Sequence, residues 1–260
     1  MGEPVGAAGA DGGRAAPGPY AERASRLPGA VLWRTTTVPG ARPVLPDGCT
    51  DLIWGAGRLL VAGPDTGPQA PGGAVPAGTR WVGLRFAPGQ GPAVFGVPAH
   101  ELRDRRVPLA DLWGDRRARE LAERAAAGAP GAVLEEAARD ALRAAGRWAP
   151  GDGAPGELPG RDGRTAAIVS GLGRGRPVAE VARLAGMGER RLHRHSLTVF
   201  GYGPKTLGRV LRLVRALELA RAGVSYAEVA ARAGYADQAH LAREVKSLAG
   251  APMGALLGPG

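Results

Sequence analysis

Apolar residues recur at helical spacing near the end of the chain, between polar residues that start and stop helices. Ser225 is followed three residues later by Glu228, which forms a capping box that satisfies the free amides at the start of a helix. Gly234 tolerates the positive φ at which a helix ends, and Asp237 can cap another helix. The pattern over residues 225–252 therefore predicts a helix, a tight turn and a second helix.

The same pattern occurs once earlier, over residues 178–194. The matched pairs are Ala179 and Ala227, Glu180 and Glu228, Val181 and Val229, Ala182 and Ala230, Ala185 and Ala233, Gly186 and Gly234, Leu192 and Leu241, and Arg194 and Arg243. The first six pairs lie 48 residues apart and the last two lie 49 apart, which places one extra residue in the turn of the second copy. We interpret this internal repeat as a duplicated helix-turn-helix.

A single longer helix is predicted between the two copies. Leu207, Leu211, Val214 and Leu219 recur at helical spacing within residues 204–222. At about 1.5 Å per residue this helix is roughly 28 Å long. That length is near the ~34 Å between successive major grooves on one face of a duplex. One chain could thus present two reading helices one turn of DNA apart.

A longer set of landmarks extends over residues from about 164 to 253. They are Leu192, Arg194, Gly203, Pro204, Arg212, Ala216, Glu228, Val229, Ala230, Gly234, Tyr235, Leu241, Arg243, Lys246, Gly250 and Pro252. This set resembles the DNA-binding domain of the AraC/XylS family of bacterial transcription regulators, and the resemblance implies two helix-turn-helix units joined by a long helix. Four positions depart from the family pattern: Ser196 and Val245 replace phenylalanine, Leu207 replaces tyrosine, and Gly188 replaces a capping serine. The first unit is therefore expected to pack more loosely and to be poorly capped.

The first part of the chain has a different pattern, in which short apolar or β-branched runs alternate with glycines and prolines. These runs predict strands at residues 30–38, 42–46, 51–63, 79–89 and 93–97. Helical spacing then returns at residues 108–127 and 132–145. Several short strands with such turns indicate a small antiparallel barrel or sandwich. The family resemblance implies a cupin-like barrel as one form of this domain.

The segment VLPDGCTDLIW, with LLVAGPDT and VGLRFAPG after it, is similar to an uncharacterised domain found ahead of such DNA-binding domains. The resemblance implies sensing or dimerisation but names no ligand. The expected fold class is therefore α+β, with a β-rich domain and trailing helices followed by an all-α double helix-turn-helix. The expected boundaries are a tail at 1–19, the β-rich domain at 20–147, a Pro- and Gly-rich linker at 148–163, the DNA-binding domain at 164–253 and a flexible tail at 254–260.

Charge is distributed unevenly between these regions. Residues 161–260 hold 16 Lys or Arg against 7 Asp or Glu, a net charge of +9, whereas residues 1–160 hold 18 against 17. A basic region that coincides with a duplicated reading motif predicts an interface for double-stranded DNA. Arginines on helices are often only a solvated face, but here they coincide with the repeat.

Positions on the two expected reading helices point to direct contacts with bases. By their place in the motif, Arg190, His193 and Arg194 in the first unit match the base-reading positions of the family, as do Gln238, Ala239 and Arg243 in the second. Arginine suits guanine, glutamine suits adenine, and an alanine methyl can contact thymine. Contacts with phosphate are expected for Lys205, Arg209, His240 and Lys246. For each of these residues the alternative is plain exposure to solvent.

The single cysteine, Cys49, lies in the segment PDGCTD. It could act as a redox or electrophile sensor. The alternative function for the chain is an alkyl-acceptor or small-molecule-modifying protein that acts through an N-terminal pocket and Cys49. The favoured interpretation is a small buried residue beside a turn, because Asp47 and Asp51 would raise the pKa of a nearby thiol.

No catalytic or cofactor motif accompanies these features. The sequence has no Walker loop, GxSxG, CxxC or HExxH spacing, and His193 and His195 point opposite ways on a helix. No enzyme activity, metal or cofactor is expected, and a cytoplasmic, DNA-associated location is expected from the absence of a signal peptide or an apolar span. The expected partners are double-stranded DNA, a small-molecule effector, RNA polymerase and a second copy of the chain, with no membrane partner.

Overall fold

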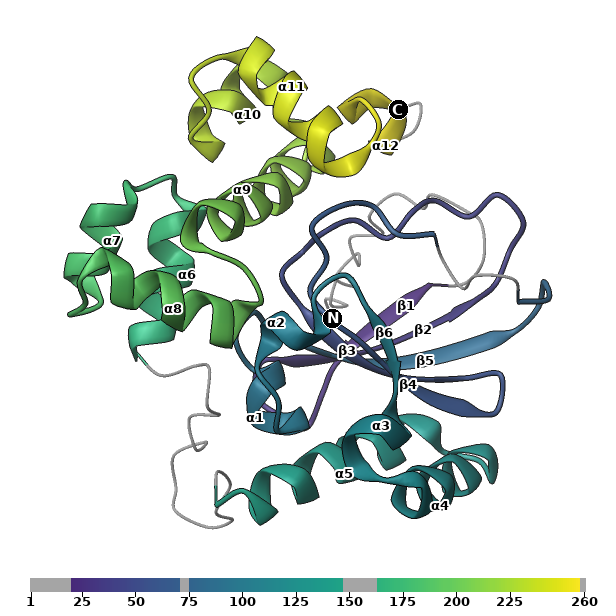
Figure 1. Ribbon diagram of the computed structural model, residues 1–260. Helices are drawn as coiled ribbons and strands as arrows, with labels where there is room; N and C mark the ends of the chain where they lie inside the picture. Colours follow the sequence, from purple (N-terminus) through teal and green to yellow (C-terminus); the bar gives the residue numbers. More distant parts are fainter. Residues whose placement is uncertain (1–19, 71–74, 147–162, 258–260) are drawn as a thin grey trace, which may run out of the picture.

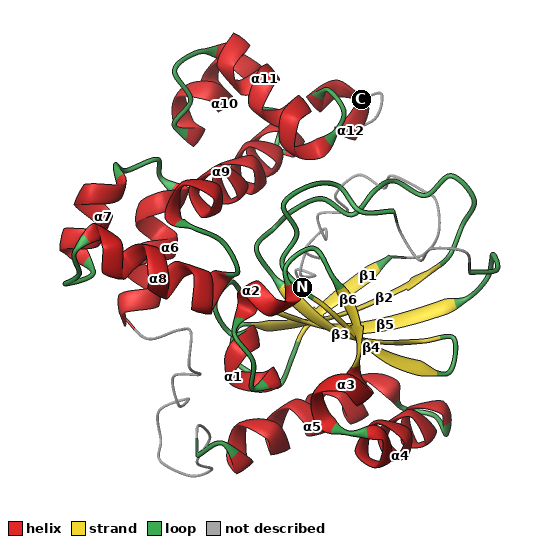
Figure 2. Ribbon diagram, in the orientation of Figure 1, coloured by secondary structure: helices red, strands yellow, loops and turns green. Residues whose placement is uncertain are grey.

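The computed structural model describes residues 20–70, 75–146 and 163–257, which form two domains (Figure 1). The first domain has a sheet with helices packed on one face, and the second is helical (Figure 2). The expected α+β class is confirmed. The expected tail at 1–19 and residues 147–162, which include nearly all of the expected linker, lie outside the described residues.

The described strands form one antiparallel sheet in the order β1-β2-β5-β3-β4-β6. Their bounds are β1 (Ala21–Ala24), β2 (Ala30–Thr36), β3 (Thr50–Gly55), β4 (Arg58–Ala62), β5 (Arg80–Phe86) and β6 (Arg106–Pro108). Because β1 and β6 are the two edges, the expected barrel or two-sheet sandwich is not formed within the described part of the chain. Helices, not a second sheet, cover the apolar face.

Alternation along the strands divides the sheet into an apolar face and a mixed face. Leu52, Leu84 and Phe86 are buried on the face that packs against the helices. Their strand neighbours, including Asp51 and Arg85, point to the other face. Pairing in register therefore brings charged side chains together on one side of an otherwise apolar sheet.

Five of the described helices belong to this first domain. They are α1 (Gly91–Phe95), α2 (Ala99–Leu102), α3 (Leu109–Trp113), α4 (Asp115–Ala126) and α5 (Pro130–Ala144). The helix predicted over 108–127 is split at Gly114, where φ is 84° and the right-handed helix cannot continue. Residues from α4 and α5, including Leu121, Leu134 and Leu142, complete the core beneath the sheet.

Two of the predicted strands are wrong. Most of residues 93–97 lies in α1, which has Pro92 in its first turn, a favoured place for proline. Residues 42–46 form only the isolated bridge from Val44 to Gln69, because Pro43 and Pro46 lack the amide that a longer ladder needs.

The second domain has seven described helices. Their bounds are α6 (Gly163–Gly173), α7 (Val178–Leu184), α8 (Glu189–Phe200), α9 (Pro204–Arg221), α10 (Tyr226–Ala233), α11 (Gln238–Ala249) and α12 (Met253–Leu257). The pairs α7–α8 and α10–α11 are the two predicted helix-turn-helix units, and α9 is the predicted connecting helix. The tail expected from residue 254 is helical as far as Leu257, because Met253 anchors α12 in the core of the second unit. None of the described helices is long and apolar enough to cross a bilayer.

Helix α9 belongs to two separate hydrophobic cores. Leu207 and Val210 pack with the first unit, whereas Leu213 and Leu217 pack with the second. All four side chains are at most 4% exposed. The connecting helix therefore fixes how the two units are placed along its axis.

Candidate nucleic-acid interface and a neighbouring cavity

The first reading helix, α8, presents its basic residues to solvent. Arg190, His193 and Arg194 are exposed, whereas Leu192 is fully buried beneath them. The ring of His193 lies beside Gly203, where a Cβ atom would stand 2.9 Å from the histidine Nε2. The helix begins at the extended residue Gly188, without a hydrogen bond from a capping side chain, so the expectation of a poor cap is confirmed.

The second reading helix, α11, is capped and similarly exposed. The Asp237 Oδ1 accepts a hydrogen bond from the His240 amide at 2.6 Å, and the Ser225 Oγ accepts one from the Glu228 amide at 3.4 Å in α10. Both predicted caps are therefore present. Three residues expected to read bases, Gln238, Ala239 and Arg243, are all exposed.

The four residues expected at phosphates divide into two pairs. Lys205 and Lys246 are exposed, with no ion pair within the described structure. Arg209 instead donates to Glu244 from Nε at 2.7 Å and from NH2 at 3.2 Å, and these contacts lower the pKa of Glu244. His240 Nδ1 accepts a hydrogen bond from the Ala236 amide at 3.2 Å. Arg209 and His240 thus have internal partners within the domain.

Two family models match the chain. A helix-turn-helix domain model matches residues 181–257, and a model for a domain of unknown function matches residues 30–108. The carboxyl-terminal domain is of the AraC type. The chain has the domain organisation of an AraC-family regulator, with an uncharacterised domain ahead of a DNA-binding domain. Searches of curated proteins and of solved structures find no significant match.

The amino-terminal domain of this regulator contains a cavity of about 470 Å³ on the mixed face of its sheet. Side chains from β2, β3, β4, β5 and β6 form its floor, and the segments that precede β3 and follow β4 line it as well. The volume is in the range of small-molecule sites, which are commonly about 300–1,000 Å³.

Two tryptophans of the cavity lie over glycines of neighbouring strands. Trp33 pairs with Gly83, where a Cβ atom would stand 2.2 Å from the indole. Trp81 pairs with Gly55, where the same atom would stand 2.1 Å away. Each indole can therefore lie across the sheet only because its partner has no side chain. Tyr20 stacks near Trp33, with ring centroids 6.3 Å apart, so three aromatic rings line the cavity.

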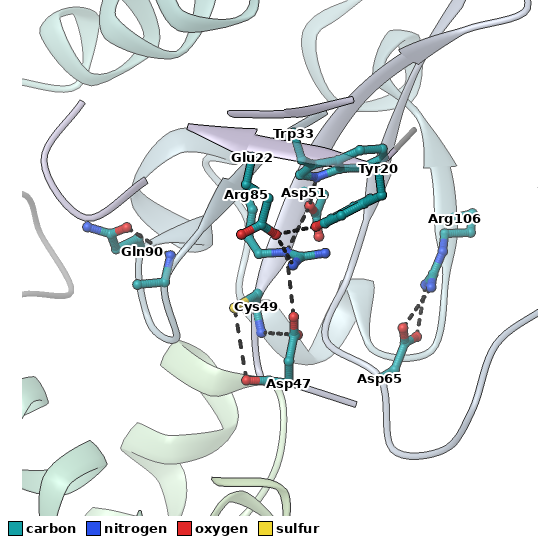
Figure 3. A network of polar contacts seen from close by, with 11 residues as sticks. Tyr20, Glu22, Trp33, Asp47, Cys49, Asp51, Asp65, Arg85, Gln90 and Arg106 are labelled. Atoms are coloured by element: carbon teal, nitrogen blue, oxygen red, sulfur yellow. Dashed lines mark hydrogen bonds and ion pairs between the residues drawn. The ribbon is translucent and has the colours of Figure 1, made fainter. Parts of the chain in front are cut away.

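A row of charged residues lies on the mixed face of the sheet (Figure 3), and most of its members line the cavity. Arg85 lies among three carboxylates, with N–O distances of 3.3 Å to Asp51, 3.5 Å to Asp47 and 3.6 Å to Glu22. The Trp33 Nε1 donates to Asp51 at 2.5 Å. Burial raises the pKa of Asp51 despite the opposing effect of Arg85. Burial alone would lower the pKa of Arg85, but the carboxylates of Asp51 and Asp47 outweigh it and raise that pKa.

A second ion pair completes the row. Arg106 donates from both terminal nitrogens to the two oxygens of Asp65, at 2.8 and 2.6 Å. In this bidentate geometry both terminal nitrogens of the guanidinium donate to one carboxylate. Of the residues in this row, the sequence alone pointed only to Asp47 and Asp51, as neighbours of Cys49. Charged residues at alternate positions of otherwise apolar strands were the available signal.

Cys49 lines the same cavity. Its Sγ lies 3.9 Å from the Asp47 carbonyl oxygen. Burial, followed by the charge of Asp47, holds the pKa of this thiol well above its ordinary value. The thiolate needed for sensing or alkyl transfer is therefore disfavoured, as the flanking carboxylates indicated.

The two domains meet at the turn between α8 and α9. Tyr202 in this turn is 2% exposed, and a Cβ atom at Gly48 would stand 3.3 Å from its hydroxyl oxygen. The Arg103 NH1 donates to the Gly201 carbonyl at 3.2 Å. The first reading unit thus rests directly on α2 and on the residues beside Cys49.

The second unit touches the segments around the cavity. The Arg42 NH1, from a residue that lines the cavity, donates to the Leu256 carbonyl in α12 at 2.6 Å. Leu45 packs against the core of the second unit, and a Cβ atom at Gly250 would stand 3.2 Å from Pro68. Both reading units therefore contact segments adjacent to the cavity.

Proposed function

We propose that this DNA-binding regulator inserts α8 and α11 into successive major grooves and thereby controls transcription. The observation that carries the proposal is the pair of exposed, arginine-bearing helices joined by one continuous helix of 18 residues. At about 1.5 Å per residue α9 is roughly 27 Å long, close to the spacing of one turn of DNA. The proposed target of these helices is chromosomal DNA in the cytoplasm.

The proposed contacts follow from side-chain chemistry and exposure. Arg190, Arg194 and Arg243 can donate to guanine, Gln238 can pair with adenine, and Ala239 can contact a thymine methyl group. His193 lies on the same exposed face of α8. Lys205 and Lys246 are assigned to phosphates, whereas Arg209 and His240 support the packing of α11 and the turn before it.

Control by a small molecule in the amino-terminal domain is part of the proposal. Its support is the cavity together with the contacts that its surrounding segments make with both reading units. An occupant that shifts the segment containing Asp47 would act next to Tyr202 and therefore on the start of α9. RNA polymerase and a second copy of the chain are the further partners that the family resemblance implies.

Selection from a random pool of duplexes, followed by affinity measurements at fixed salt, tests the reading model. The selected site should contain two half-sites about 10 base pairs apart. Arg194→Ala and Arg243→Ala should each cost about 1–3 kcal/mol, but only when the contacted base pair is present. Arg119→Ala removes an equal charge from an exposed position in α4 and should change little. An equal loss on every duplex would contradict base reading.

A further inference from the structure

We propose that the sheet cavity binds an organic cation with a flat apolar body, the positive group at Asp47 and Asp51 and the body against the tryptophan rings. The inference rests on the proposed function and deepens it, because this cation would be the small molecule that controls DNA binding.

The floor of the cavity is shaped for a flat apolar group. Trp33 and Trp81 each have one ring face against a glycine, and both line the cavity with Tyr20. Ile53 and Leu60 lie beside them on the same face of the sheet. Rings of this kind pack well against planar ligands, and they attract cations placed over their faces.

The charged row has an excess of carboxylates. Glu22, Asp47 and Asp51 all lie within 3.6 Å of Arg85, while Asp65 is paired with Arg106. Three carboxylates therefore surround the single guanidinium of Arg85, which gives a local formal charge of −2, while Asp65 and Arg106 neutralise each other. An added ammonium or amidinium group would reduce this excess.

The arginines of the row are poorly suited to capture an anion. Arg106 already holds both oxygens of Asp65, and an anion approaching Arg85 would meet three carboxylates. Arg42 and Arg58 also line the cavity. Arg42 donates to the Leu256 carbonyl, and Arg58 pairs with Gly55, at the far end of β3 from Asp51. Four residues of strand separate these ends by about 13 Å, so Arg58 does not offset the charge beside Asp51.

The raised pKa of Asp51 also favours a cation as the ligand. Burial raises its pKa, with Arg85 opposing and Asp47 adding to the rise. A bound cation favours the ionised carboxylate, so its affinity should increase as pH rises through this pKa. The other charged or titratable groups that face Asp51 are Glu22, Asp47, Cys49, Tyr20, Arg85 and Arg106.

Three probes of matched size separate the charge of the ligand from its shape. These are 2-phenylethylamine, 2-phenylethanol and phenylacetate, each titrated into the full chain without DNA and followed by tryptophan fluorescence and calorimetry. We expect the amine to bind at least about tenfold more tightly than the alcohol, which corresponds to one ion-pair contact of about 1.4 kcal/mol. Phenylacetate should bind most weakly. Equal binding of all three, preference for phenylacetate, or no binding of the amine would overturn the proposal.

Variants locate the binding group. Asp51→Asn keeps an oxygen that can accept from the Trp33 indole, and it should lower amine affinity at least about tenfold without improving binding of the alcohol. Asp47→Asn should act in the same direction and serves if the first variant unfolds. Asp140→Asn changes an exposed carboxylate in α5 and should have no effect. Unchanged amine binding in both cavity variants would overturn the assignment.

DNA binding is measured separately, so the two proposals can fail independently. Amine binding that leaves affinity for the selected duplex unchanged would support the cation site and contradict its role as effector site. Normal reading of the duplex by a chain that binds no amine would support the reading model and overturn the cation site.

Discussion

Cys49 shows how its surroundings set the chemistry of a single residue. The thiol lies near three ionisable side chains, yet the two that are acidic and its own burial all act against ionisation, and only Arg85 opposes them. The same surroundings make Asp51 reluctant to ionise. These two residues therefore share a region that is poor at stabilising negative charge.

Alkylation of Cys49 by iodoacetamide should be slow in the folded chain. Because the thiolate is the reacting form, a pKa one unit higher lowers the rate about tenfold at a given pH. We expect at least this difference between the native chain and the chain unfolded in guanidinium chloride, both measured by mass spectrometry at neutral pH. Equal rates would contradict the effect of burial and of Asp47.

The ion cluster in the cavity could not be predicted from its single residues. Asp51 and Arg85 are far apart in the sequence, and they meet because β3 pairs with β5 in a register that sets them opposite each other. A shift of either strand by one residue would send its own charged side chain to the apolar face and separate the pair. Nothing local to either residue specifies that register, so the ion cluster could not be derived from the sequence alone.

At the scale of elements, the helical units were predictable because their signals are local. Ser225 and Asp237 lie at the caps that their side chains predicted, and glycines such as Gly234 end helices at positive φ. Strands β1 and β6 were missed because each is short and depends on pairing with a longer neighbour. The sheet stays open, and does not close into the expected barrel, because its edge strands β1 and β6 do not pair with each other.

The weak start of α8 predicts a stabilising substitution. Gly188 is extended, and a Cβ atom there would meet nothing within 4 Å. Gly188→Ser should therefore stabilise the chain by about 0.5–1 kcal/mol, since serine caps the helix and restricts the unfolded chain. Gly186→Ser is the matched control, because φ at Gly186 is 65° and a side chain would be strained there. Chemical denaturation measures both, and destabilisation by Gly188→Ser would contradict the expected cap.

At the scale of the whole molecule, the domain contact links the cavity to the reading helices. Gly201 fits against Pro64 and Ala99, where a Cβ atom would approach within 2.6 and 3.2 Å. Tyr202 is buried beside Gly48, and its hydroxyl has no hydrogen-bond partner among the described residues. A small displacement of the segment containing Asp47 therefore acts on a closely packed turn.

Loss of the Arg103 contact should loosen this docking. The guanidinium donates to the Gly201 carbonyl at 3.2 Å, and removing it should cost about 1 kcal/mol because the arginine is partly solvated. Arg103→Ala should then lower the melting temperature by about 2–4 °C. Arg105→Ala is the control, since the Arg105 NH1 donates to Glu101 within its own domain. An equal fall in melting temperature for both substitutions would mean that the hydrogen bond from Arg103 to Gly201 does not hold the domains together.

The burial of the turn after α8 has a consequence for how the chain unfolds. Phe200 and Tyr202 are at most 2% exposed, and part of what covers them comes from the other domain: the segment at Gly48 for Tyr202 and Gly89 for Phe200. Separating the two domains would expose the part of each ring that the first domain covers. The two domains that the family models delimit should therefore unfold together as one cooperative unit. Calorimetry of the intact chain should record a single melting transition that includes both domains.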